Sequence, residues 1–212
     1  MNTFENLLGY FKKDSMLHAR FINTISLLEY IGARKILKSQ HEGAISATVL
    51  GHVSEEIRHA QIFKRVALKM SGGKLPTYDD QYLLAGPAAR DYFQGLDHGI
   101  AAELEIPNGW LNYLYSTLLI EERAGKIYPS YNLFLGEQGF PGVLEAIVLE
   151  ENEHLKDVYD FLGEADAEKM EMRLVRMRAL EERLYDAFMK QALTECQVHV
   201  QNEPSWTISP TA

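Results

Sequence analysis

The chain of 212 residues contains a single cysteine, Cys196. One cysteine excludes an internal disulfide bond and any metal or redox centre built from paired cysteines, and it is typical of a protein in a reducing compartment. The sequence also has no stretch of about 18 apolar residues and no basic region followed by an apolar run at its start, so neither a membrane span nor a secretion signal is predicted. These absences predict a soluble, cytoplasmic protein.

Positive charge is scarce, because 21 Lys and Arg residues face 30 Asp and Glu residues, which gives a formal net charge of −9 at pH 7. No basic cluster dominates any predicted face, which argues against nucleic acid as a partner. Strand-like alternation is absent, whereas helical periodicity recurs along the chain. With 46% hydrophobic residues, the chain can fill the core of one domain. The composition therefore predicts an all-α protein.

Apolar periodicity and the positions of glycine and proline predict five helices. Pro129 lies inside the third of them and is expected to kink it. Residues 1–198 are predicted to form one helical domain, and residues 199–212 a polar tail to which no structure is assigned. The helices are predicted from Asp14-Ser15 to between Lys38 and His41, from Gly43 to Met70, from Asn108 to Leu135, from Pro141 to Leu162, and from Asp166 onward.

The segment 72–107 is rich in glycine and proline around one short helical piece near Ala88 to Gln94. A connection of this length is typical of a crossover that lets the helices on either side run parallel. Long loops are often functional, so this segment and Pro129 are expected to form or gate a mainly apolar cavity that reaches the metal site described below. The alternative is a connector packed on the outside of the helices. The apolar residues considered for the cavity wall are Tyr82, Leu83, Leu84, Tyr92, Phe93 and Leu96.

A duplicated motif is the most informative feature of the chain. Residues 55–59 read Glu-Glu-Ile-Arg-His and residues 150–154 read Glu-Glu-Asn-Glu-His, and each contains Glu-x-x-His, which places Glu and His on one helix face. Each copy follows, at a similar interval, a glutamate in an apolar stretch, Glu29 in one half and Glu121 in the other. Small residues follow both of these glutamates by one helical turn. The two halves therefore predict equivalent contributions to one site.

These residues predict a centre with two metal ions. Carboxylates are almost never buried unless they are paired or bound to a metal ion, and four carboxylates with two imidazoles are typical of di-iron or di-manganese sites in helical bundles. Such ligands suit iron or manganese. The predicted cofactor is two Fe ions, with an Mn/Fe pair as the alternative. The predicted metal ligands are Glu29, Glu56, His59, Glu121, Glu151 and His154.

Neighbouring residues offer alternatives to these ligands. Glu122 competes with Glu121, but it has a surface explanation as an ion pair with Lys126, four residues further on. Glu55 and Glu150 also share a helix face with the histidines, yet Glu-x-x-His is the arrangement that known bundles use, so both are assigned to a solvated edge. One turn before the first motif, His52 is a candidate for lining the same cavity, although a lone histidine is more often structural.

With these motifs the chain resembles the ferritin-like di-iron carboxylate superfamily, which includes rubrerythrins, aldehyde-deformylating oxygenases and ribonucleotide reductase small subunits. The resemblance covers about residues 15 to 165. It implies a ferritin-like four-helix bundle with a long crossover and an additional C-terminal helix. It also implies that Glu56 and Glu151 are the carboxylates that bridge the two metal ions.

The resemblance implies an oxidoreductase, a di-iron oxidase or oxygenase that activates O2 for oxidation of a small or lipid-like organic substrate. Such an enzyme needs an external electron donor, and a homodimer is compatible with it. A rubrerythrin-like peroxide reductase is the alternative, although that family usually carries a four-cysteine site. A ferritin-like ferroxidase is a further alternative, although its centres generally have one Glu-x-x-His. A non-catalytic helical protein would leave six matched polar residues on core faces unexplained.

Overall fold

The computed structural model describes residues 3–39, 45–104 and 109–202, and these contain helices and loops but no strand. The all-α prediction is therefore confirmed for this part of the chain. None of the helices in these ranges has the length and apolar character that crossing a membrane requires. The α-helices are α1 Thr3–Phe11, α2 Ser15–Ser39, α3 Ala47–Met70, α4 Gly86–Glu103, α5 Gly109–Glu137, α6 Glu145–Ala165 and α7 Met170–Asn202, and a short 3-10 helix, η2, spans Asp80–Tyr82.

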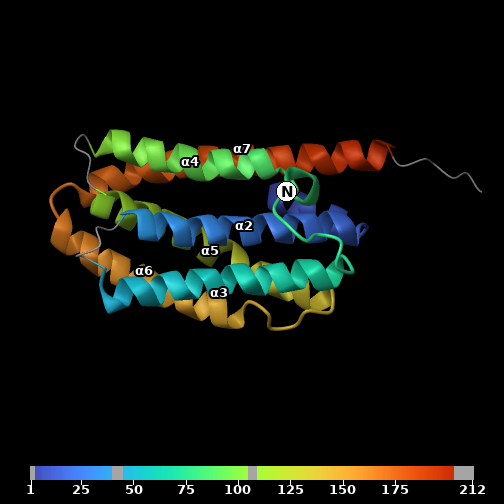
Figure 1. Cartoon of the computed structure of the whole chain (residues 1–212). Coiled ribbons are helices and arrows are strands. Elements are labelled where there is room, and N and C mark those ends of the chain that lie inside the picture. Colours follow the sequence, from blue (N-terminus) through green and yellow to red (C-terminus); the bar gives the residue numbers. More distant parts are fainter. Residues whose placement is uncertain (1–2, 40–44, 105–108, 203–212) are drawn as a thin grey trace, which may run out of the picture.

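The long helices pack in pairs along their lengths, α2 with α3, α5 with α6 and α4 with α7 (Figure 1). The α2–α3 and α5–α6 pairs are antiparallel, and α2 also contacts α5. Helices α3 and α5 run in the same direction, as the length of the connection between them predicts. The Glu-x-x-His motifs lie on α3 and α6, and the single glutamates Glu29 and Glu121 lie on α2 and α5.

The connection between α3 and α5 differs from the predicted crossover because α4 spans 18 residues rather than one short helical piece. Its glycines do not end the helix but lie where α4 meets α7. A Cβ atom on Gly95 would lie 2.9 Å from Leu184 Cδ2, and one on Gly99 would overlap Leu180. Glycine therefore permits a close approach of two helices here. The sequence interpretation was wrong at this point because it treated both residues as helix breakers.

Other boundaries also differ from those predicted. Helix α7 continues to Asn202, beyond residue 199 where the tail is predicted to start, and residues 203–212 lie outside the described ranges. Asp166 does not cap α7 but is the C-terminal cap residue of α6, and its carboxylate accepts hydrogen bonds from Tyr115 and Arg173. Helix α5 continues through Pro129, as predicted, and ends at Glu137 rather than at Leu135. The sequence interpretation missed α1, although its buried residues Phe4, Leu7 and Phe11 lie at helical spacing.

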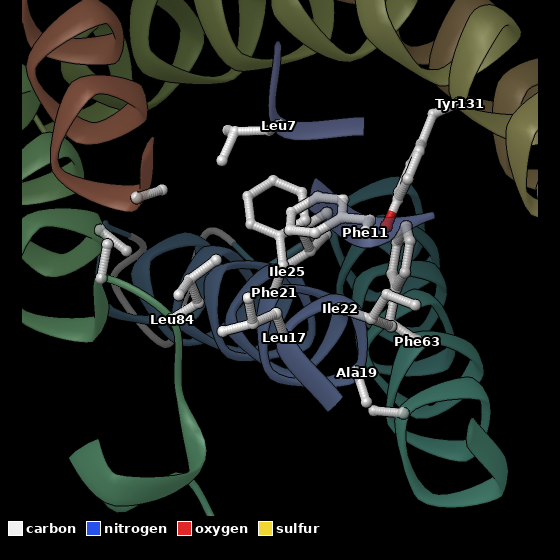
Figure 2. Close-up of a cluster of buried hydrophobic side chains, with 14 of the residues drawn as sticks. Leu7, Phe11, Leu17, Ala19, Phe21, Ile22, Ile25, Phe63, Leu84 and Tyr131 are labelled. Atoms are coloured by element: carbon white, nitrogen blue, oxygen red, sulfur yellow. The ribbon is translucent and has the colours of Figure 1, made fainter. Parts of the chain in front are cut away.

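Helix α1 closes one end of the hydrophobic core. Its buried residues Leu7 and Phe11 lie beside Phe21 of α2 and Tyr131 of α5 (Figure 2). His18 is fully buried in the same region, with its ring stacked on Phe11 at a centroid distance of 4.9 Å. Its Nε2 lies 2.9 Å from the Tyr131 hydroxyl. Burial lowers the pKa of His18 from 6.5 to about 4.

This shift predicts a loss of stability in mild acid. Between pH 6.5 and pH 4 the unfolded chain binds a proton at His18 and the folded protein does not. The free energy of unfolding therefore decreases as the pH is lowered, by up to about 3 kcal/mol. In a His18→Gln variant, whose amide can still bond Tyr131, this part of the pH dependence should be absent. Denaturant unfolding of both proteins at pH 7 and pH 4.5 measures the difference. Equal slopes would show that His18 is protonated in the folded state.

Candidate metal centre

The structure brings the six predicted ligands together where α2, α3, α5 and α6 meet. Two groups of four side chains have ligand atoms within 4.8 Å of one another, a composition and spacing that can hold a metal ion. Glu56 belongs to both groups. We call the first group, Glu29, Glu56, His59 and Glu151, position 1. We call the second group, His52, Glu56, Glu121 and His154, position 2.

The carboxylates that the family resemblance names as bridging lie between the two positions. Glu56 contributes to both. The two oxygens of Glu151 face different histidines, since Oε1 is 3.1 Å from His59 Nδ1 and Oε2 is 3.3 Å from His154 Nδ1. Each of these side chains is held by a helix, so the spacing of three residues within each motif directs Glu and His to the same side. The two motifs thus face one another across a shared cluster.

Each motif histidine is held from behind by a glutamate of the other motif. His59 Nε2 on α3 lies 2.8 Å from Glu150 Oε2 on α6, and His154 Nε2 on α6 lies 2.7 Å from Glu55 Oε2 on α3. A proton on Nε2 satisfies this carboxylate and leaves Nδ1 free to act as a ligand. The side chains of Glu55 and Glu150 are 37% and 26% exposed, as their assignment to a solvated edge predicts, but that assignment missed their bonds to the histidines. The doubled glutamate was visible in the sequence, but its partner on another helix was not.

One buried atom tests whether a metal ion fits. The side chain of His59 is fully buried, and its Nδ1 has no hydrogen-bond partner of acceptable geometry in the described part of the chain. An unsatisfied buried nitrogen costs about 1–3 kcal/mol, and such atoms are rare in folded proteins. A cation among the position 1 carboxylates would satisfy it.

The crowding of buried carboxylates alters their protonation. Burial and the charge of Glu151 raise the pKa of Glu121 to about 8, and burial and the charge of Glu56 raise the pKa of Glu29 well above its usual value. Burial disfavours a charged His154, yet hydrogen bonds to Glu121 and Glu151 raise its pKa to about 11. Protons on these groups therefore offset the negative charge of the cluster in the metal-free protein. Bound cations would displace them.

The two adjacent glutamates of α5 have different environments. Glu121 is 3% exposed and belongs to position 2. Glu122 instead accepts hydrogen bonds from Arg178 Nη2 at 2.6 Å and from the Tyr159 hydroxyl at 2.8 Å. Its hydrogen-bond partners thus belong to α7 and α6, rather than to its own helix as the predicted pair with Lys126 requires. The placement of both side chains agrees with the helix register that selects Glu121.

A cavity of about 400 Å³ reaches the cluster from the side of α4 and α7. Glu29, Glu56 and Glu121 form part of its wall, and most of the remaining wall is apolar. A mainly apolar cavity that reaches the ligands is therefore present, as predicted, but Pro129 does not line it. Of the crossover residues considered for its wall, Tyr92 and Phe93 line it and the other four do not. Further apolar wall residues are Phe21, Ile25, Ile120, Phe188 and Met189.

A glycine beside the cluster yields a prediction with an internal control. A Cβ atom on Gly32 would lie 3.3 Å from Glu56 Oε2, whereas one on Gly125, at a similar place in the other half, would meet nothing within 4 Å. Both residues lie inside helices, where alanine is favoured over glycine by about 0.5–1 kcal/mol. We expect Gly125→Ala to raise stability with unchanged metal affinity, and Gly32→Ala to weaken metal binding by displacing Glu56. Metal titration and thermal unfolding of both variants measure this. Equal metal affinities would show that Glu56 moves aside without cost.

Comparisons of the chain with protein-family models, with curated proteins and with solved structures found no match. The resemblance to ferritin-like carboxylate proteins therefore depends on the duplicated motif and on the arrangement of helices and ligands.

Proposed function

We propose that this protein is a ferritin-like di-iron carboxylate oxidase or oxygenase, which uses O2 and electrons from an external donor to oxidise a small or lipid-like apolar substrate. The observation that carries the proposal is a pair of four-ligand groups sharing Glu56 and opening into an apolar cavity. Iron suits a set of carboxylates and imidazoles.

The helix arrangement supports the ferritin-like part of this proposal. Two antiparallel pairs, α2–α3 and α5–α6, with a long connection between parallel α3 and α5, match the topology of such bundles. Their metal ligands are a glutamate from each of two helices and Glu-x-x-His from each of the other two. Helices α2 and α5 carry the single glutamates here, and α3 and α6 carry the motifs. The α4–α7 pair is then an additional layer that completes the cavity.

The roles of the chain's own residues follow from their positions. Two iron ions held by these residues would pass electrons from the external donor to O2 and would supply the oxidising power to attack a C–H bond. Glu55 and Glu150 orient the motif histidines, and the apolar wall binds the substrate and keeps bulk water from the cluster. Because the cavity volume of about 400 Å³ lies within the range of small-molecule sites, the substrate is a small organic molecule or part of a longer one. Turnover of peroxide alone requires no apolar site of this size, which favours an organic substrate.

Metal analysis of the protein tests the proposal directly. The protein, purified and reconstituted with Fe(II) and then exposed to air, should contain about two irons per chain and show absorption typical of coupled ferric ions. Many irons per chain would favour storage. Rapid peroxide turnover without any effect of apolar compounds on the iron spectrum would favour a peroxide reductase. Failure to bind iron would overturn the proposal.

Two neighbouring alanines of α4 test the role of the cavity. Ala101 and Ala102 are both exposed, but only Ala101 belongs to the cavity wall. We expect Ala101→Trp to obstruct the cavity, and Ala102→Trp to leave it open, at little cost to folding because both sites face solvent. Perturbation of the iron spectrum by long-chain or aromatic compounds should weaken in the first variant only. An equal response in both variants would place the binding of these compounds elsewhere.

A further inference from the structure

We propose that His52 is a seventh metal ligand, and that it makes the two metal positions unequal, so that position 2 selects Fe(II) over Mn(II). This inference rests on the di-metal centre proposed above and concerns its composition. It goes beyond the six residues of the duplicated motifs, because the second half of the chain has no histidine that corresponds to His52: the equivalent place, four residues before Glu151, is Ile147.

The geometry of His52 is that of a ligand. Its side chain is 7% exposed, and its Nε2 lies 3.2 Å from Glu56 Oε1 and 3.4 Å from Glu121 Oε1, so one nitrogen faces carboxylates from two different helices. Its other nitrogen, Nδ1, lies 2.8 Å from the Tyr113 hydroxyl. His59 and His154 show the same division, with one ring nitrogen facing the cluster and the other held from behind. Tyr113 thus orients the His52 ring, as Glu150 and Glu55 orient the rings of His59 and His154.

His52 also lies beside the other imidazole of position 2. The ring centroids of His52 and His154 are 4.1 Å apart. Position 2 therefore offers two imidazoles and two carboxylates, whereas position 1 offers one imidazole and three carboxylates. Imidazole suits iron, and a site rich in carboxylates suits manganese. When both ions are supplied, position 2 should take iron and position 1 should keep the larger share of manganese.

A competing role for His52 is a hydrogen bond to Glu56 without any contact to metal. In that role each position would have a single imidazole, so the imidazoles would give neither position a preference for iron. The distribution of the two metals between the positions therefore separates the two roles.

The decisive experiment is reconstitution of the metal-free wild-type protein, without oxygen, with equal amounts of Fe(II) and Mn(II). Crystals of this sample, measured at the iron and manganese absorption edges, locate each element. We expect iron to predominate between His52 and His154, and manganese to be concentrated beside His59. Equal mixtures at the two positions, or the reverse order, would overturn the inference while leaving the di-metal centre in place. An absence of metal at both positions would instead contradict the proposed function.

Substitution gives a second, independent measurement. His52→Gln retains much of the side-chain volume but removes the imidazole, and His98→Gln is its control, because His98 lines the cavity and belongs to neither ligand group in the described residues. Titration with Fe(II) measures the affinity of each bound ion. In His52→Gln we expect the affinity of at least the more weakly bound ion to fall by at least about tenfold. In His98→Gln we expect no change. Unchanged affinity in a folded His52→Gln protein would show that His52 is not a ligand. If that variant does not fold, the wild-type diffraction measurement still decides the question.

Discussion

Replacement of His59 or His154 by alanine should remove metal from the protein. Each substitution takes a neutral nitrogen from one metal position and leaves its carboxylates to repel one another, so we expect clearly less than the wild-type iron content in both variants. The loss should be larger at position 1, where His59 is the only imidazole, than at position 2, where His52 remains. Elemental analysis of the purified and reconstituted variants measures the occupancy.

Substitution of the glutamates behind these histidines gives a graded control. Glu55→Gln and Glu150→Gln retain a hydrogen-bonding group but remove the charge that holds Nε2 of the histidine. Residues that orient a ligand in this way typically contribute about 10–100-fold to metal affinity, so both variants should bind metal more weakly than the wild type and more tightly than the alanine variants. Full occupancy in His59→Ala and His154→Ala would contradict the six-ligand assignment on which the proposed centre depends.

The parts of the centre that the sequence predicts are those set by local geometry. Residues three apart share a helix face whatever lies around them, so the Glu-x-x-His spacing alone specifies the relative placement of Glu56 and His59. The duplicated interval then predicts that the second half supplies equivalent groups. A glutamate in an apolar stretch needs a partner in the core, and this requirement identifies Glu29 and Glu121.

Contacts between different helices could not be predicted in the same way. The pairing of Glu55 with His154 joins residues 99 positions apart. Nothing in the local sequence distinguishes such a glutamate from one on a solvated face. As a single histidine, His52 has no duplicated counterpart to mark it, and its significance depends on Glu121, which approaches from another helix. The glycines of α4 were misinterpreted for the same reason, because only the position of α7 explains them.

Substitution of Glu121 and of Glu122 should change stability in opposite directions in the metal-free protein. Burial and the charge of Glu151 raise the pKa of Glu121 to about 8, so at pH 7 folding must protonate this carboxyl. Glu121→Gln removes that cost, and we expect the unfolding free energy to rise by about 1 kcal/mol or more. Glu122→Gln breaks a charge-assisted pair with Arg178 and weakens the bond from Tyr159, so we expect a loss of about 1 kcal/mol. For a chain of this size, each change corresponds to a shift of about 2–4 °C in Tm.

Addition of metal should reverse the order of these two variants. A ligand that binds only the folded state stabilises it by about 2.7 kcal/mol at a free concentration one hundred times its Kd, so the wild type and Glu122→Gln should both gain several degrees in Tm. Glu121→Gln should gain much less, because it lacks a position 2 ligand. Thermal unfolding with and without Fe(II), in the absence of oxygen, measures all six values. If Glu122→Gln lost the metal-dependent gain and Glu121→Gln kept it, the register of α5 would be shifted by one residue. The carboxylate of position 2 would then be Glu122, and the pairing with Arg178 would not persist in the metal-loaded protein.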